Sequence, residues 1–219
     1  MADSALPTRM FNRVTVTRAL PPATSEEIAG RVIGFYAAAR GGEYLVNDPW
    51  GTLDLEPFGF ERWWDLPFMI RAAGGSPPPE SRGLRIEEVR HEDQRAAFES
   101  ALVDGFAIEE LRHTGSPVVF DRSVLSDPSL RMWVAFMDEQ VIGTAVALVG
   151  HGVVGVYLVT VVDAARGRGL GEALTWRATL ADPALPATLQ ASSMGKPLYN
   201  RMGYRTIATC QTWVGQRRL

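Results

Sequence analysis

The feature that most constrains the fold is a glycine-rich turn between a strand-like segment and a helix-like segment. The apolar residues 155–162 predict a strand in the middle of a sheet. They lead into residues 166–171, with the sequence RGRGLG, and a helical pattern then continues until Pro183. Glycines let backbone N–H groups approach a ligand closely, and the positive end of a helix favours an anion. The turn is therefore predicted to cradle a phosphate.

Two common phosphate-binding motifs do not fit this turn. A P-loop has a Lys-Ser or Lys-Thr pair after its last glycine, whereas Glu172 and Ala173 stand there. The dinucleotide-binding pattern GxGxxG would need a glycine at position 172. The alternative is a plain connection, in which the glycines only permit a tight turn.

A proline-rich segment divides the chain. Three consecutive prolines in SPPPES, residues 76–81, exclude a helix and remove backbone donors from a sheet. We therefore predict two parts, residues 1–80 and residues 81–219. From residue 84 onward, the order strand, helix, loop, three strands, helix, strand, helix and strand predicts an α/β or α+β domain with a mixed sheet.

Two segments of the second part carry matching motifs. In VTVVDAARGRGLGEAL, Arg166, Gly169 and Gly171 follow the predicted central strand. Further on, LQASSMGKPLYNRMGYR combines a strand and a helix, with Tyr199 shortly before a Gly-Tyr pair. The first segment resembles the acetyl-CoA signature of the GNAT N-acetyltransferase superfamily, and the second resembles a later strand and helix of the same fold. The resemblance covers residues 84–214. It implies an α/β fold with a mixed, mainly antiparallel central sheet flanked by helices.

The resemblance also implies acetyl-CoA as the co-substrate. It places a backbone N–H that stabilises the carbonyl oxygen where the central strand separates from its neighbour, around Val161 and Val162. Many GNAT proteins have an asparagine before the tyrosine helix, and Ser192 and Ser193 stand near that place, where a serine hydroxyl could bind the pantetheine arm. The predicted acetyl-CoA-binding residues are Val161, Val162, Arg166, Gly167, Arg168, Gly169, Leu170, Gly171, Ser192 and Tyr199.

By the same resemblance, Tyr199 is the general acid that protonates the CoA sulfur. A thiol has an ordinary pKa of about 8.5 and a tyrosine of about 10, so the mismatch in proton transfer is modest. A tyrosine packed on the sheet, with its hydroxyl bound to backbone, is the alternative. An amine acceptor also requires a base. Glu110 is the candidate, because Glu109 and Glu110 follow the first predicted helix of this domain, although paired acids are also typical of a solvated face.

The first eighty residues contain a segment that is similar to the second motif. In residues 52–71, as in residues 196–214, a short helical piece ends at a Gly-aromatic pair and an apolar strand follows. We therefore predict a degenerate half of a GNAT domain at residues 1–80. This half lacks the matching tyrosine and the glycine-rich turn, so it should not bind CoA. An unrelated lid or dimerisation arm is the other interpretation.

Composition limits the partners. The 22 Lys and Arg against 25 Asp and Glu give a net charge of −3, so no positive excess is present to neutralise nucleic acid. No stretch reaches the roughly 18 apolar residues of a membrane helix, and Cys210 has no second cysteine to pair with. We expect a cytoplasmic protein with no nucleic-acid or membrane partner. His91, His113 and His151 lack metal-ligand spacing, so we expect no metal.

The sequence thus favours an N-acetyltransferase that moves an acetyl group from acetyl-CoA to the primary amine of a small molecule by direct attack. Two alternatives stay open: a protein lysine or N-terminal acetyltransferase, and a non-catalytic acyl-CoA-binding sensor. The motifs fix neither the acceptor, nor the acyl-chain length, nor the choice between a monomer and a homodimer.

Overall fold

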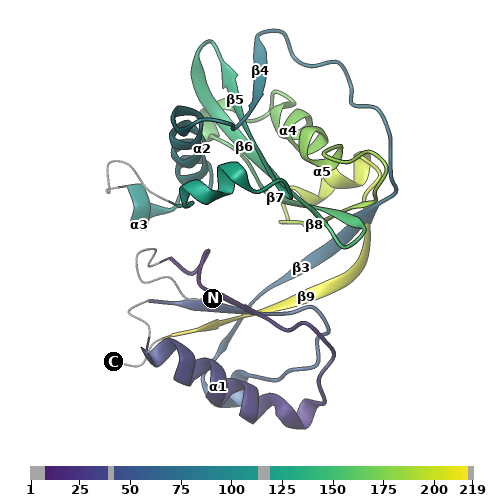
Figure 1. Cartoon of the computed structure of the whole chain (residues 1–219). Helices are drawn as coiled ribbons and strands as arrows, with labels where there is room; N and C mark the ends of the chain where they lie inside the picture. The colour runs from purple at the N-terminus through teal and green to yellow at the C-terminus, as the bar shows by residue number, and fades with distance from the viewer. Residues whose placement is uncertain (1–7, 39–41, 113–118, 217–219) are drawn as a thin grey trace. The chain divides into compact units, whose positions relative to one another are not determined.

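The structure is a computed structural model that describes residues 8–38, 42–112 and 119–216 (Figure 1). The predicted loop near residues 115–117, and His113, lie outside the described residues. The chain forms two compact units. Unit 1 comprises Met1–Phe68, Ala191–Met194 and Thr206–Leu219, and unit 2 comprises Met69–Gln190 and Gly195–Arg205.

Unit 1 packs one long helix against a small sheet. Its strands follow the order β1-β2-β9-β3, with β1 parallel and β9 antiparallel to β2. Every residue of β2 is buried, and Ala29 and Val32 of the helix pack into the same apolar core as Val46. The elements are β1 (Arg13–Thr15), η1 (Pro22–Thr24), α1 (Ser25–Ala38), β2 (Tyr44–Asp48), η2 (Glu56–Phe58), β3 (Glu61–Arg71) and β9 (Arg205–Gly215).

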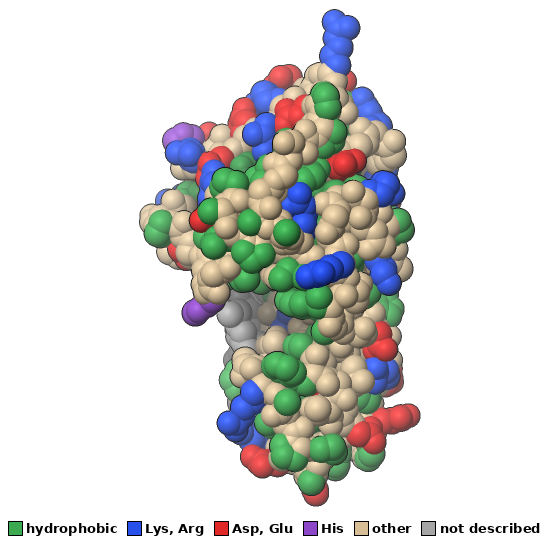
Figure 2. Space-filling view, turned by 90° about the vertical axis from the view of Figure 1, so that its right-hand side faces the viewer, with side chains coloured by type: hydrophobic (Ala, Val, Ile, Leu, Met, Phe, Trp, Pro, Cys, Tyr) green, Lys and Arg blue, Asp and Glu red, His purple; other side chains and the backbone are tan. Residues whose placement is uncertain are grey.

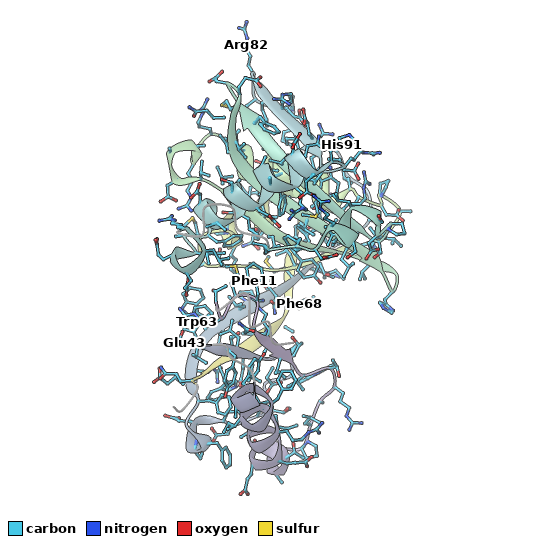
Figure 3. The ribbon with its side chains drawn as sticks, turned by 60° about the vertical axis from the view of Figure 1, so that its left-hand side comes forward. Phe11, Glu43, Trp63, Phe68, Arg82 and His91 are labelled. Atoms are coloured by element: carbon cyan, nitrogen blue, oxygen red, sulfur yellow. The ribbon has the colours of Figure 1, made fainter. Side chains whose placement is uncertain are left out.

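Aromatic and charged side chains hold the edges of unit 1 together. The Tyr36 and Tyr44 rings stack with centroids 4.0 Å apart, which joins α1 to β2. The Arg9 guanidinium lies over Trp63, 4.4 Å from the ring centroid, and its Nη1 is 2.7 Å from Oε2 of Glu43. Figure 3 labels Glu43 and Trp63. These three rings thus contribute to the packing of unit 1.

Unit 2 contains the strand and helix pattern that starts at residue 84. Its strands follow the order β8-β7-β6-β5-β4; β4 to β7 pair antiparallel, and β7 and β8 pair parallel. The elements are β4 (Leu84–Glu88), α2 (Glu92–Gly105), α3 (Glu109–Arg112), η3 (Arg122–Ser126), β5 (Leu130–Met137), β6 (Gln140–Gly150), β7 (Val153–Val161), η4 (Asp163–Ala165), α4 (Leu170–Thr179), β8 (Ala187–Gln190) and α5 (Lys196–Arg201).

The two long helices of unit 2 cover opposite faces of its sheet (Figure 1). A side-chain carbon added at Gly105, in α2, would lie 2.5 Å from the Thr160 hydroxyl. One added at Gly171, in α4, would lie 3.9 Å from Cγ2 of Val161. Successive residues of a strand point to opposite faces, so α2 lies on the Thr160 face and α4 on the Val161 face.

The predicted fold class is confirmed, and most element bounds agree with the sequence pattern. The predicted helix 92–105 is α2, and the predicted central strand is β7. The two units differ from the predicted division at residue 80. Strand β9 belongs mainly to unit 1, because it pairs with β2 from Gln211 to Gly215, and this long-range pairing leaves no mark in the local pattern.

The predicted similarity between residues 52–71 and residues 196–214 is present in the structure as two closely similar turns. After η2, Gly59 has φ 85°, and the following amide donates to the Leu55 carbonyl at 3.3 Å. After α5, Gly203 has φ 88°, and the following amide donates to the Tyr199 carbonyl at 2.9 Å. Leu55 therefore holds in unit 1 the place that Tyr199 holds in unit 2, and it carries no hydroxyl.

The surface carries charges of both signs. In the face shown in Figure 2, positive and negative side chains are mixed with hydrophobic ones. None of the helices among the described residues is both long enough and apolar enough to cross a membrane. Within the same residues, no cluster of three or more His, Cys, Asp or Glu side chains is arranged to hold a metal ion.

Candidate active site

The centre of the site is a bulge in β7. Thr144 of β6 pairs with Thr160, and Val146 pairs with Tyr157, so two residues of β7 stand opposite the single residue between them. One of the two, Leu158, has φ 50°, a left-handed backbone that costs a residue with a side chain about 1–2 kcal/mol. The Thr144 hydroxyl donates to the Leu158 carbonyl at 2.7 Å. The bulge is thus fixed from the neighbouring strand.

Beyond the bulge, no strand among the described residues pairs with the edge of β7 that faces away from β6. The parallel pairing with β8 covers only Val154 and Gly155, so the two strands separate before the bulge. The Val162 amide donates to the Ile142 carbonyl of β6 at 2.9 Å. Because backbone N–H directions alternate along a strand, the Val161 amide points to the free edge. Of the two predicted oxyanion donors, Val161 is therefore available and Val162 is bound within the sheet.

A second amide faces away from β6, and the sequence did not indicate it. The carbonyl of Leu158 is held by Thr144, and the N–H of Val159 belongs to the same peptide group. In a trans peptide the C=O and N–H point in opposite directions, so the Val159 N–H is aimed away from Thr144. The bulge leaves this peptide without a regular backbone pairing in β6, and positions 158 and 159 carry no glycine or proline that would signal it.

The glycine-rich turn forms an open backbone cradle at the start of α4. Gly167 has φ 79° and Gly169 has φ 77°, a region that other residues rarely adopt. A side-chain carbon at Gly167 would meet nothing within 4 Å. Among the described residues, no protein acceptor is assigned to the amides of residues 167–171. Free amides at a helix N-terminus match a diphosphate.

The Arg166 side chain supports the turn from within the protein. Its Nε donates to the Val161 carbonyl at 3.1 Å, and its Nη2 donates to the Gly105 carbonyl at 3.2 Å. Its Nη1 lies 2.7 Å from Oδ1 of Asp163. The guanidinium thus ties α2, β7 and the turn together, which indicates a structural contribution to the cradle.

The segment before β4 also reaches the turn. The Ser81 hydroxyl donates to the Arg168 carbonyl at 3.2 Å, and Glu80 forms an ion pair with Arg177 of α4 at 2.5 Å. The three prolines of residues 76–81 predict only a linker. In the structure, its end holds one peptide of the predicted phosphate cradle.

Three predicted parts of the site meet at one glycine. A side-chain carbon at Gly171 would lie 3.8 Å from Cδ2 of Leu198, in α5, and 3.9 Å from Cγ2 of Val161, in β7. Tyr199 follows Leu198 directly. The cradle, the open edge of β7 and the tyrosine helix therefore lie together in unit 2.

Tyr199 is held close to its own helix start. Its amide donates to the Gly195 carbonyl at 3.1 Å, and its ring lies edge-on to Tyr204, with centroids 6.0 Å apart. The Tyr204 hydroxyl hydrogen-bonds to that of Thr179 at 2.6 Å, whereas no such partner within the described parts of the chain is assigned to the Tyr199 hydroxyl. Burial raises the pKa of Tyr199, which keeps it protonated at neutral pH.

Of the remaining predicted residues, Glu110 and Ser192 are exposed and Leu170 is buried. Glu110 is exposed in the short helix α3, next to Glu109, which pairs with Arg112 at 2.5 Å. Ser192 is exposed in Ala191–Met194, a segment that belongs to unit 1. Leu170, the first residue of α4, is buried, so only its backbone can take part in the cradle.

Comparison with known proteins decides the family. The family model of the acetyltransferase (GNAT) domain matches residues 101–214, just over half of the chain. The chain belongs to the GNAT acetyltransferase family. This family normally uses acetyl-CoA, and the open amides of the cradle fit the diphosphate of that co-substrate. No curated protein matched the chain.

Several solved structures share the GNAT fold. A GCN5-related N-acetyltransferase from Kribbella flavida aligns over 92% of this chain and 80% of its own, at 20% identity and a TM-score of 0.68. One from Sphaerobacter thermophilus aligns over 98% and 76%, at 18% identity and a TM-score of 0.62. A tandem GNAT protein from the clavulanic acid biosynthesis pathway aligns over 95% and 76%, at 11% identity and a TM-score of 0.58. At these coverages, the alignments include most of residues 1–80.

Proposed function

We propose that this protein transfers an acetyl group from acetyl-CoA to the primary amine of a small molecule by direct attack. The observation that carries the proposal is the meeting of cradle, open strand edge and tyrosine helix at Gly171. A phosphate site alone would suit many ligands. An open strand edge with free amides next to a protonated tyrosine suits a thioester.

Each part has a role in the reaction. The amine nitrogen forms a bond to the acetyl carbon, and negative charge develops on the carbonyl oxygen, where the amides of Val159 and Val161 stabilise it. The C–S bond then breaks, and Tyr199 gives its proton to the leaving sulfur. Glu110 is the candidate to take the proton that the amine loses, directly or through water. The tyrosinate then regains a proton from solvent.

The proposed acceptor is a small amine in the cytoplasm, with no nucleic-acid or membrane partner. The net charge of −3 suits a cationic acceptor better than an acidic one. A protein lysine or N-terminus is the second candidate, and a silent acyl-CoA sensor is the third. The three candidates differ in whether they release the thiol of CoA and in which acceptor they acetylate.

A thiol-release assay separates them. The purified protein is mixed with acetyl-CoA and, in turn, a panel of small primary amines and a panel of lysine peptides, and mass spectrometry identifies the acetylated product. Faster thiol release with small amines supports the proposal. Faster release with peptides supports the second candidate. Tight binding of acetyl-CoA without thiol release in any mixture would contradict catalysis.

A further inference from the structure

The Thr144 hydroxyl is the one side-chain group that fixes the bulged peptide of β7 among the described residues. Thr144 lies on β6 and is fully buried, with 0% of its surface exposed. Its hydroxyl has a single hydrogen, which it donates to the Leu158 carbonyl at 2.7 Å. The bond crosses from one strand to the next at the place where their register shifts.

The hydrogen bond from Thr144 replaces a backbone hydrogen bond that the sheet cannot supply to the Leu158 carbonyl. In a regular antiparallel pair, a carbonyl that points toward the neighbouring strand accepts a backbone N–H. The extra residue of the bulge breaks this pairing, so the Leu158 carbonyl would lack that backbone donor. The threonine side chain provides a donor instead, and it does so next to a residue that already has a left-handed backbone, φ 50°.

We infer that Thr144 is a positioning residue for acetyl transfer. It holds the Leu158–Val159 peptide so that the Val159 N–H points away from β6 and toward the acetyl carbonyl. The inference rests on the proposed function, since the peptide matters for rate only if a thioester carbonyl binds at this edge. Thr144 touches neither acetyl-CoA nor the acceptor in this assignment. It acts through the backbone.

The alternative is that Thr144 only satisfies a buried carbonyl and stabilises the fold. The two roles predict different kinetics. Loss of a purely structural bond lowers the melting temperature and leaves the turnover of the folded fraction unchanged. Loss of a positioning bond lowers kcat in folded protein, because the amide no longer meets the developing charge.

Thr144→Ser and Thr144→Ala form the decisive pair, because both lack the threonine methyl group and they differ only in the hydroxyl. With saturating acetyl-CoA and the best acceptor of the amine panel, we expect Thr144→Ala to lower kcat by about 10-fold to 100-fold. We expect Thr144→Ser to keep kcat within about threefold of wild type, and the KM for acetyl-CoA to change less than kcat in both. Thr144→Val, which keeps the volume, should behave as Thr144→Ala.

A buried threonine in unit 1 serves as the control. Thr212 of β9 is also 0% exposed, and its hydroxyl is 3.5 Å from Oδ1 of Asn47. Thr212→Ala should lower the melting temperature without lowering kcat.

The outcomes separate the two hypotheses. If Thr144→Ala keeps the wild-type kcat, or if Thr144→Ser loses as much as Thr144→Ala, the positioning role is wrong while acetyl transfer stands. If the wild type binds acetyl-CoA and releases no thiol, the proposed function is wrong and the role of Thr144 fails with it. Should Thr144→Val not fold, the Ser and Ala pair still decides.

Discussion

Gly195 and the ring of Tyr199 are in such close contact that no other residue fits at position 195 without movement. A side-chain carbon there would lie 2.8 Å from Cε2 of Tyr199 and 3.2 Å from its hydroxyl oxygen. Gly195 has φ −80°, so the reason for glycine is space and not backbone conformation. The glycine before α5 thus sets where the proposed acid can lie.

Gly195→Ala should therefore displace the Tyr199 ring. We expect kcat to fall by about tenfold or more, because a small displacement of an acid from its target is costly, with a smaller change in the KM for acetyl-CoA. Gly34→Ala is the control, since a side chain at Gly34 in α1 meets nothing within 4 Å. An unchanged kcat in Gly195→Ala would show that the tyrosine position is not critical.

Tyr199→Phe should lower kcat by about 100-fold while acetyl-CoA still binds, because only the proton donor is lost. Burial raises the pKa of Tyr199 above its ordinary value, so its own titration should not reduce kcat below a pH of about 10. Steady-state kinetics between neutral pH and pH 10 test both statements. Tyr36→Phe, in the core of unit 1, is the matched variant and should keep its turnover.

The sequence predicts the parts of this site well because they are local. The glycine turn, the strand before it and the tyrosine helix each follow from residues within a few positions of one another. The family resemblance orders them along the chain. Gly171 lies close to Val161 and Leu198, so the structure brings these three segments together as the order implied by the resemblance predicts.

What the sequence misses depends on contacts between distant segments. The bulge at Leu158 depends on its pairing with β6, and Leu158 itself is an ordinary strand residue. Ser81 was part of a proline-rich linker, yet it contacts residue 168, which lies 87 positions later. Strand β9 belongs to unit 1 through its pairing with β2, and no periodicity indicates which strand a chain will choose as its neighbour.

Gly169→Ala should weaken the binding of acetyl-CoA. Gly169 is the N-cap residue directly before α4 and has φ 77°, so alanine there would cost about 1–2 kcal/mol or force the cradle to another shape. We expect the Kd for acetyl-CoA, measured by calorimetry, to rise about tenfold.

Gly152→Ala is a matched control for backbone strain. Gly152 has φ 78° and lies in the turn between β6 and β7, where a side chain would meet nothing within 4 Å. It should lose similar stability and keep its affinity for acetyl-CoA. Equal losses of affinity in both variants would assign the effect to stability and not to the cradle.

High pH should destabilise the fold through buried tyrosines. Burial raises the pKa of Tyr36 and of Tyr204 to about 12. Below a pH of about 10, both are neutral in the folded and the unfolded chain, and their contribution is complete. Between pH 10 and 12, only the unfolded chain ionises, so stability falls. Urea midpoints at pH 9, 10 and 11 should decrease steadily; a constant midpoint would contradict this assignment.

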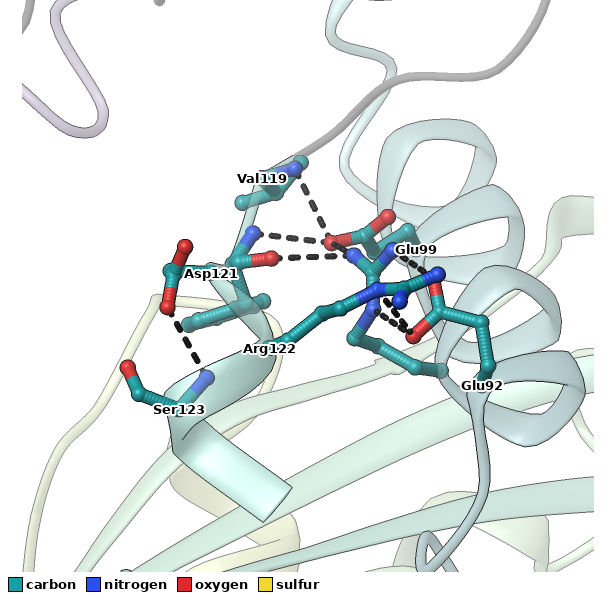
Figure 4. A network of polar contacts seen from close by, with 8 residues as sticks. Glu92, Glu99, Val119, Asp121, Arg122 and Ser123 are labelled. Atoms are coloured by element: carbon teal, nitrogen blue, oxygen red, sulfur yellow. Dashed lines mark hydrogen bonds and ion pairs between the residues drawn. The ribbon is translucent and has the colours of Figure 1, made fainter. Parts of the chain in front are cut away.

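Glu99 should be the carboxylate of unit 2 whose loss costs the most stability (Figure 4). It is 98% buried, since 2% of its surface is exposed, and its Oε1 accepts from Arg95 at 2.6 Å and from the amides of Val119 and Phe120 at 2.9 and 2.8 Å. One oxygen thus joins α2 to the start of the segment that leads to β5. Glu99→Gln removes the buried one of the two carboxylates that pair with Arg95, whereas Glu92 still pairs with it. An amide oxygen is also a weaker acceptor than a carboxylate. We expect a loss of about 2 kcal/mol in urea unfolding. Glu109→Gln, which breaks an exposed pair with Arg112, should change stability by less than about 1 kcal/mol. Equal losses of stability in the two variants would mean that the burial of Glu99 does not increase its contribution to stability.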